Sequence, residues 1–291
     1  MPAYSIAQIL KDPKVGEAVR FQLPSVLRHL GAKSKYVADL TGEIISIGTA
    51  EDGLDHYENA LHRVLVKAGL SAQTSVTFEQ RAKSIYAQIR DYVGCNVCDI
   101  GCGDGRLGAL LSQKGHNVSL CDTYRNSNIT KLGLSFDRIP KNTSLPYKDN
   151  TFDTSLLVTV LHHSNHPLGT VREARRITKH GGRVVIIESV YGVNKPGLST
   201  VDAKGEKMFR ALETEQQRLF IGFFDHFYNR GIHYSKRPET KVNVPLNFNT
   251  PSGWNRIFEE IGLHPEQTTY LGVDQKAVPE YHTLHVCSVK K

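Results

Sequence analysis

Residues Val97 to Gly108 read V-C-D-I-G-C-G-D-G-R-L-G, a short apolar strand that ends at an aspartate and runs into three alternating glycines. Glycine lets a backbone turn tightly and approach a ligand that a β-carbon would obstruct, and the following helix directs its first amides at that ligand. Loops that bind a dinucleotide pyrophosphate place a third glycine where this chain has Arg106. The stretch therefore predicts a turn that holds a nucleoside and argues against a pyrophosphate.

Further elements can be read on the carboxyl side of this turn. Leu107 to Lys114 is a helical stretch, and Val118 to Asp122 is a second strand that again ends in an acid. Thr151 to Val160 reads as a fourth strand that leads into Leu161-His162-His163, and Gly181 to Val190 reads as a fifth. Strands that alternate with helices are typical of a parallel sheet, which binds ligands at the carboxyl ends of its strands.

These segments together resemble the class I S-adenosylmethionine-dependent methyltransferases, in particular the branch with ubiquinone and menaquinone biosynthesis methyltransferases. The shared landmarks are the glycine turn, Asp122, Leu145-Pro146-Tyr147, Thr151-Phe152-Asp153, Leu161-His162-His163 and the Gly181-Gly182 pair. The resemblance covers about residues 90 to 190. It implies an α/β fold: a Rossmann-like, doubly wound, seven-stranded and mostly parallel sheet with an antiparallel last strand.

The resemblance also implies S-adenosylmethionine as the cofactor. Asp122 is expected to accept both ribose hydroxyls, and Asp99 to hold the amides of the glycine turn. Asn142 stands near the place of a family aspartate that accepts the adenine amino group, and its amide oxygen can do the same. The residues expected at the cofactor are Asp99, Gly101, Cys102, Gly103, Asp122, Thr123, Asn142, Thr143, Ser144 and Val160. Taken singly, each also fits a turn or cap with no ligand.

The flanks of the predicted sheet are expected to be largely helical. Residues 1–90 are interpreted as a helical N-terminal cap, and residues 91–291 as the methyltransferase domain with a helical lid insertion at 192–240. Within the cap, Ile6 to Leu30 is helical but interrupted by Pro13 and Pro24, whereas Gly42 to Gly53 is ambiguous and is compatible with a strand-like loop. Helical spacing follows at Tyr57, Leu61, Val64 and Leu65, and again at Phe78, Ala82, Ile85, Tyr86 and Ile89.

Beyond the fifth strand, one helix is expected over Glu206 to Arg230 and another over Trp254 to Ile261. Strands at Tyr270 to Val273 and Tyr281 to Lys290 would complete the sheet. Phe220, Phe223, Phe224, Phe227 and Tyr228 form one aromatic face of the first helix. This face either packs only against the core or also walls an apolar acceptor pocket, for which we name Phe223, Phe227, Tyr228 and Tyr234.

Methyl transfer requires a base only when the acceptor must lose a proton, and histidine suits that role near neutral pH. His162 and His163 follow the fourth strand at the edge where such sheets bind ligands, so they are candidate catalytic residues. Asp225 and His226, beside the aromatic face, are the other candidates. Each of these side chains also has a structural reading, as a brace of its loop or a solvated helix residue.

Composition sets limits on partners and location. The formal charge is +7, but the basic residues form no long block, so we expect no nucleic-acid partner. We find no apolar run long enough to span a membrane and no basic-then-apolar start, and we therefore expect a cytoplasmic protein. The five cysteines do not form a disulfide framework, and Cys95, Cys98 and Cys102 lie where their thiols should not converge on one metal ion. A homo-oligomer is compatible with the sequence.

The sequence favours S-adenosylmethionine-dependent methyl transfer to oxygen, nitrogen or carbon of a small molecule. Two alternatives remain open. An RNA methyltransferase would use the same core, although the chain lacks an asparagine-proline-proline-aromatic signature. A non-catalytic module would keep the cofactor pocket and lack turnover.

Overall fold

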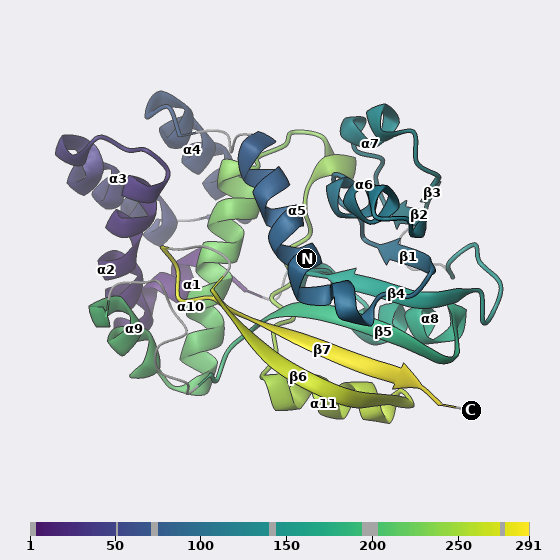
Figure 1. Ribbon diagram of the computed structural model, residues 1–291. Coiled ribbons are helices and arrows are strands. Elements are labelled where there is room, and N and C mark those ends of the chain that lie inside the picture. The colour runs from purple at the N-terminus through teal and green to yellow at the C-terminus, as the bar shows by residue number, and fades with distance from the viewer. Residues whose placement is uncertain are drawn as a thin grey trace. The chain divides into compact units, whose positions relative to one another are not determined.

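The computed structural model describes residues 4–50, 52–70, 75–139, 144–193, 203–273 and 277–290. Its strands form one sheet in the order β3-β2-β1-β4-β5-β7-β6. The strands are β1 Asn96–Ile100, β2 Asn117–Asp122, β3 Phe136–Arg138, β4 Phe152–Val158, β5 Thr178–Val190, β6 Leu263–Val273 and β7 Tyr281–Val289. Strands β1 to β5 pair in parallel, and β7 runs antiparallel (Figure 1). The predicted seven-stranded, mostly parallel sheet is confirmed.

The register brings the carboxyl ends of the central strands to one edge. Ile100 of β1 pairs with Cys121 of β2 and with Leu157 of β4. Val158 of β4 pairs with Ile187 of β5. The loops that follow these strands are therefore neighbours, as is required of a ligand site on an open parallel sheet.

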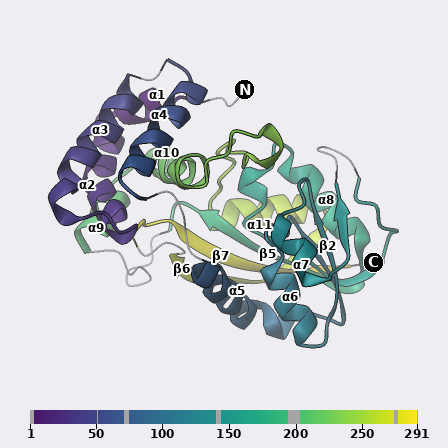
Figure 2. The same cartoon turned by 90° about the horizontal axis from the view of Figure 1, so that it is seen from above.

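Helices cover both faces of the sheet, as expected for a doubly wound fold. Helices α5 and α6 lie on one face, and α8 and α11 on the other (Figure 2). The helices of this part are α5 Ser75–Ile89, α6 Arg106–Gln113, α7 Ser127–Leu132, α8 Pro167–Ile177 and α11 Pro251–Glu260, with short 3₁₀ turns at Arg90–Tyr92 and Leu161–His163. Val184, Val185 and Ile186 of β5 are completely buried. A strand with both faces covered by helices buries successive side chains, which accounts for the continuously apolar sequence here.

The chain divides into two compact units. The helical unit comprises Met1–Ala72, Val190–Thr250 and Leu271–His282, and the sheet unit comprises the remaining segments. The helices of the helical unit are α1 Ile6–Lys11, α2 Pro13–His29, α3 Val37–Thr49, α4 Leu54–Lys67, α9 Ala203–Arg210 and α10 Thr214–His226, with 3₁₀ turns at Ser34–Tyr36 and Pro238–Thr240 and a π-helix at Phe227–Ile232. This division differs from the predicted boundary at residue 90, because α5 belongs to the sheet unit and the insertion groups with α1–α4.

The first helices begin where their sequence predicts. The Asp12 carboxylate accepts the backbone amides of Lys14 and Val15 at 3.0 and 2.9 Å, and Pro13 takes the first helical position. A proline is tolerated there because its missing N–H would have no partner inside the helix. Pro24, in contrast, lies inside α2 and does not end it.

The strand-like loop expected at Gly42 to Gly53 is wrong, since α3 covers most of it. Ile44 and Ile45 are buried on one side of this helix. A β-carbon at Gly48 would lie 2.7 Å from Leu10 Cδ1, so glycine permits close packing of α1 on α3. Tertiary packing thus outweighs the weak helix propensity of glycine and β-branched residues.

The single helix expected over Glu206 to Arg230 is also wrong. The chain breaks between α9 and α10, where Glu213 and Gln216 form a capping box that starts a new helix. After His226 the helix widens into the π-helix. Strand β6 begins at Leu263, earlier than the predicted start at Tyr270. Strand β7 begins at Tyr281, as predicted.

Candidate functional site

The glycine turn after β1 is shaped by three left-handed residues. Gly101, Gly103 and Gly105 have φ values of +72°, +55° and +76°. A β-carbon on Gly101 would lie 2.6 Å from Val160 Cγ2, whereas one on Gly103 would meet nothing within 4 Å. Gly101 is therefore required by packing against the loop after β4, while Gly103 borders open space. A ligand that approaches the backbone can use that space.

Asp122, at the end of β2, is bonded to this turn. Its Oδ2 accepts the backbone amide of Gly103 at 2.9 Å, and its Oδ1 accepts the amide of Thr123 at 2.6 Å. Burial raises the pKa of the Asp122 carboxyl, and the two amide hydrogen bonds oppose that shift. The acid thus lies beside the open space at Gly103, with Thr123 exposed next to it.

Asp99 has a different environment from the one expected. The Gly103 amide is held by Asp122 rather than by Asp99. Asp99 is buried in β1, and this burial, together with the carboxylates of Asp122 and Asp104, raises its pKa to about 7. A carboxyl group whose pKa is raised by burial thus lies directly before the turn.

The cysteines near the turn do not resemble a metal site. Cys98 and Cys121 are buried in adjacent strands with their Sγ atoms 3.9 Å apart. Cys102 is buried in the turn, where burial raises the pKa of its thiol, and Cys95 is exposed before β1. A thiol must lose its proton to bind a metal, and burial without a cation opposes that loss.

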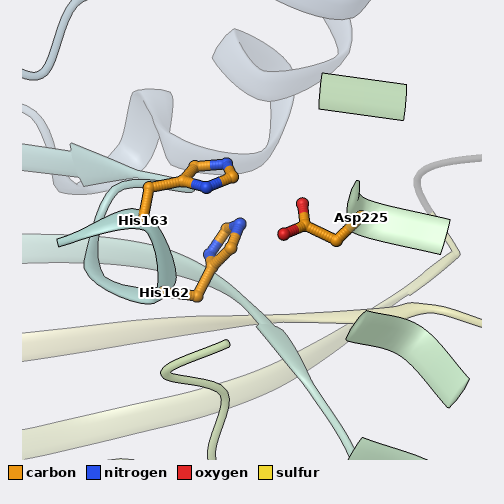
Figure 3. Close-up of side chains that lie close together, drawn as sticks. All are labelled: His162, His163 and Asp225. Atoms are coloured by element: carbon orange, nitrogen blue, oxygen red, sulfur yellow. The ribbon is translucent and has the colours of Figure 1, made fainter. Parts of the chain in front are cut away.

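His162 and His163 follow β4 in a 3₁₀ turn. Their ring centroids are 4.0 Å apart, and Figure 3 shows the two rings side by side. His162 is buried and His163 is partly exposed. Immediately before them, Thr159 has a left-handed φ of 55°, and its backbone amide is held by Ile187 O at 2.7 Å. Both histidines and Val160 are thus carried by a constrained loop at the carboxyl edge of the sheet.

Glu188 contacts this loop, and the sequence did not lead us to predict it as a site residue. It lies in β5, is completely buried, and accepts hydrogen bonds from the amides of Val160 and Leu161 at 2.8 and 2.6 Å. Its Oε2 is 2.5 Å from Nδ1 of His162. The sequence did hold a signal for this residue, since Glu188 is the one acid in the largely apolar segment Val184–Val190. A carboxylate buried in such a strand needs hydrogen-bond partners nearby.

The other two catalytic candidates, Asp225 and His226, end helix α10 in the helical unit (Asp225 is labelled in Figure 3). Asp225 Oδ1 accepts from Asn229 at 2.7 Å. The hydroxyl of Tyr4 lies 2.8 Å from His226 Nδ1, and Oε1 of the buried Glu58 lies 3.6 Å from its Nε2. Burial, with Arg230 and Lys241 nearby, lowers the pKa of His226 to about 3. Its contacts fit a structural role inside the helical unit.

The predicted acceptor residues also belong to the helical unit. Phe223 and Phe227 are completely buried and Tyr228 nearly so. The ring of Phe223 lies 5.2 Å from that of Phe224, and the ring of Phe227 lies 5.7 Å from that of Tyr228. Tyr234 stacks on His62 and donates a hydrogen bond to Asn59. Of the adenine-side residues, Ser144 is exposed, whereas Asn142 and Thr143 lie outside the described residues.

Comparison with known proteins agrees with this geometry. Residues 98–186 match the family described as a methyltransferase domain. An uncharacterized protein of Methanocaldococcus jannaschii is 42% identical over 123 residues, which cover 42% of this chain and 51% of that protein. Demethylmenaquinone methyltransferase of Paenarthrobacter aurescens is 34% identical over 101 residues, 33% of this chain and 39% of that protein.

Among solved structures, 1,6-didemethyltoxoflavin-N1-methyltransferase of Burkholderia thailandensis is similar with a TM-score of 0.47 and 15% identity, over 83% of this chain and 92% of that chain. The alignments with the two curated relatives span about half of those proteins or less. By its match over residues 98–186 and by these partial relatives, the chain is similar to methyltransferases. None of the helices in the described part of the chain is both long and apolar enough to cross a bilayer.

Proposed function

We propose that this protein transfers the methyl group of S-adenosylmethionine to a small-molecule acceptor. The observation that carries the proposal is the open space at Gly103 beside the Asp122 carboxylate, in a segment that matches the methyltransferase domain family. A nucleoside needs both features, since its ribose hydroxyls donate to a carboxylate while its body approaches a backbone without side chains.

The residues of the sheet unit fit the parts of this donor. The ribose hydroxyls would donate to Asp122, and the donor's amino acid portion would lie along Gly101, Cys102 and Gly103. Thr123, Val160 and Ser144 are proposed to flank the nucleoside. When bound, the donor supplies an activated methyl on a sulfonium, so the chain must align the acceptor and exclude water. Alignment of this kind supplies about 7–11 kcal/mol in favourable intramolecular models.

The acceptor is proposed to be a small molecule that contacts Tyr234, which is partly exposed. Phe223 and Phe227 are completely buried and Tyr228 nearly so, which fits packing against the core. An aromatic side chain with exposed surface suits an apolar or aromatic ligand. One relative is named demethylmenaquinone methyltransferase, and demethylmenaquinone is a small molecule. This name favours a small-molecule acceptor. His162, His163 and Asp225 are the proposed proton acceptors where the reaction requires one.

Binding of S-adenosylhomocysteine tests the donor half. Isothermal titration and thermal unfolding should show S-adenosylhomocysteine binding, with stabilisation of about 2.7 kcal/mol at 100 times its Kd. NAD is the control ligand, and a response to NAD alone would contradict the proposal. Asp122→Ala should weaken S-adenosylhomocysteine binding because the ribose loses its acceptor.

Transfer itself is tested with methyl-labelled donor and a cell extract that is separated into small-molecule, RNA and protein fractions. Label in the small-molecule fraction is expected. Label in RNA would instead establish the RNA methyltransferase alternative. Binding of S-adenosylhomocysteine without label in any fraction would indicate a non-catalytic module.

A further inference from the structure

Strand β3 holds the backbone at the end of β2. In the parallel pairing of the two strands, Arg138 lies opposite Asp122. The amide of Ile139, directly after β3, donates to the carbonyl oxygen of Asp122 at 2.8 Å. Nε of Arg138 donates to the carbonyl oxygen of Thr123 at 3.2 Å. The backbone that carries the Asp122 carboxylate is therefore fixed from the β3 side.

Strand β3 needs support of its own, because it has three residues and lies at the edge of the sheet. Such a segment has few backbone partners and opens easily. The hydroxyl of Tyr147 supplies a further contact, since it donates to Oδ2 of Asp137 in the middle of β3 at 2.9 Å. Burial raises the pKa of the Tyr147 hydroxyl, so it keeps the proton that it donates. Tyr147 thus holds β3 by a side-chain hydrogen bond.

The backbone of Tyr147 is in turn held by helix α8. Nη1 of Arg176 donates to the carbonyl oxygen of Tyr147 at 2.8 Å, and Nη2 donates to that of Leu145 at 3.1 Å. Oε2 of Glu173 accepts the amide of Leu145 at 2.7 Å. The ring of Tyr147 packs edge-on against Phe152 of β4, with the ring centroids 5.0 Å apart. The hydroxyl therefore reaches β3 from a fixed backbone and a packed ring.

We propose that Tyr147 is a positioning residue for the nucleoside end of the donor site, acting through β3 on the backbone of Asp122 and Thr123. The inference rests on the proposed binding of S-adenosylmethionine and deepens it. Hydrogen bonds from the ribose hydroxyls require the Asp122 carboxylate at one place, because such bonds weaken steeply with distance and angle. That place depends on the backbone that β3 holds, and Tyr147 holds β3 through Asp137.

Tyr147→Phe removes the hydroxyl and keeps the ring against Phe152. Isothermal titration should show the Kd of S-adenosylhomocysteine raised by about three- to tenfold, the size expected for one hydrogen bond. The 2′,3′-dideoxy analogue of S-adenosylhomocysteine lacks both hydroxyls that Asp122 would accept. Its Kd should therefore change by less than about twofold, as for two groups that do not interact. A residue that only stabilises the fold would weaken both ligands equally.

Variants of Asp137 test the other end of the hydrogen bond. Asp137→Asn keeps an oxygen that accepts the Tyr147 hydroxyl and should bind S-adenosylhomocysteine as wild type does. Asp137→Ala removes the acceptor and should reproduce Tyr147→Phe, and the double variant should lose no more than either single variant. The Cys98 thiol also neighbours the hydroxyl, and agreement between Tyr147→Phe and Asp137→Ala would exclude it as the cause.

Tyr92→Phe is the matched control. The Tyr92 hydroxyl donates to Oε1 of Gln267 at 2.9 Å, on the opposite edge strand β6, so the same change should leave both Kd values as in wild type. Equal losses for the two ligands in Tyr147→Phe would overturn the proposal. An unchanged Kd for S-adenosylhomocysteine would overturn it as well.

Hydrogen exchange without ligand separates this inference from the proposed function. The amide of Ile139 should exchange about three- to tenfold faster in Tyr147→Phe, because β3 opens more often. The amide of Thr159, bonded to Ile187 at 2.7 Å, should keep its rate. Failure of wild type to bind S-adenosylhomocysteine would refute the proposed function, and the exchange rates would still report whether Tyr147 holds β3. Binding by wild type with unchanged exchange at Ile139 in the variant would refute the inference alone.

Discussion

The backbone amide of Gly103 donates a 2.9 Å hydrogen bond to Oδ2 of Asp122, so the acid that ends β2 holds the glycine turn that ends β1. Removal of the whole carboxylate would disturb the turn as well as any ribose contact. Asp122→Asn is the sharper variant, because its amide oxygen can still accept from Gly103, although its NH₂ group cannot replace the oxygen that accepts from Thr123. A large loss of S-adenosylhomocysteine affinity in Asp122→Asn, with thermal stability close to that of wild type, would therefore report the charge that the ribose hydroxyls require.

Gly103→Ala is expected to weaken donor binding with only a modest loss of stability. The new methyl group would occupy open space, and the left-handed backbone costs a residue with a β-carbon about 1–2 kcal/mol. Gly181→Ala is the matched control, since Gly181 has a φ of +78° and equally open space away from the turn. Titration and thermal unfolding of both variants check the prediction, and equal donor affinity in the two would contradict it.

Gly101→Ala is expected to destabilise the protein through a clash with Val160. Overpacking of this kind costs about 1–3 kcal/mol, in addition to the backbone strain of a left-handed residue. Val160→Ala removes the two methyl carbons at 2.6 and 3.1 Å, so the double variant should recover the packing part of the loss. Urea unfolding of the two single variants and the double variant measures the coupling. If the losses in free energy of unfolding of the two single variants simply add in the double variant, the side chains at 101 and 160 do not clash.

Asp99→Asn is expected to become stabilising as the pH rises. The pKa of Asp99 in the folded protein is about 7 against an ordinary value of 3.8, so the folded state keeps a proton that the unfolded chain has lost. The contribution of Asp99 to the free energy of unfolding of the wild type therefore falls as the pH rises from 4 to 7. The fall is at most about 4 kcal/mol, because one pKa unit corresponds to about 1.4 kcal/mol. Asparagine does not ionise, and the gain of the variant over wild type should be larger at pH 8 than at pH 5.

Urea unfolding at both pH values measures this gain. Asp153→Asn is the control at the other edge of the sheet, where hydrogen bonding to Lys179 lowers the pKa of the Asp153 carboxyl. That carboxylate stabilises the fold at pH 8, so its replacement should give a loss there. A gain in Asp99→Asn that does not depend on pH would contradict the assignment.

His226→Gln is expected to make the helical unit less sensitive to acid. Burial holds the pKa of His226 at about 3, below the ordinary 6.5, so the unfolded chain binds a proton that the folded state refuses. The stability contributed by the neutral ring is complete above pH 6.5 and is lost as the pH falls toward 3. Hydrogen exchange of α10 peptides between pH 4 and 7 should show a shallower pH dependence in the variant, after correction for intrinsic exchange. His56→Gln, at an exposed position of the same unit, should behave as wild type.

Local patterns predicted the sheet and the glycine turn after β1 well. The strand into Asp99, the turn from Gly101 to Gly105 and the strand into Asp122 are each contiguous in sequence, and their glycines and acids mark where each strand ends. Helix α5 followed likewise from its periodicity. The elements that sequence reasoning assigned wrongly, α3 and the α9–α10 break, depend on contacts instead. The close packing of Gly48 against Leu10 permits α3, and the capping box of Glu213 and Gln216 starts α10.

The amino-acid sequence by itself determined the parallel sheet, the glycine turn and the acids at the strand ends, because short segments with their own periodicity and turn residues encode them. Only the tertiary structure decided which side chains meet. It joined Glu188 to His162 across 26 positions and Tyr4 to His226 across 222, and it assigned the Gly103 amide to Asp122 instead of Asp99. Such pairs depend on strand register and helix packing, which are set by burial across the whole chain and leave no local signature.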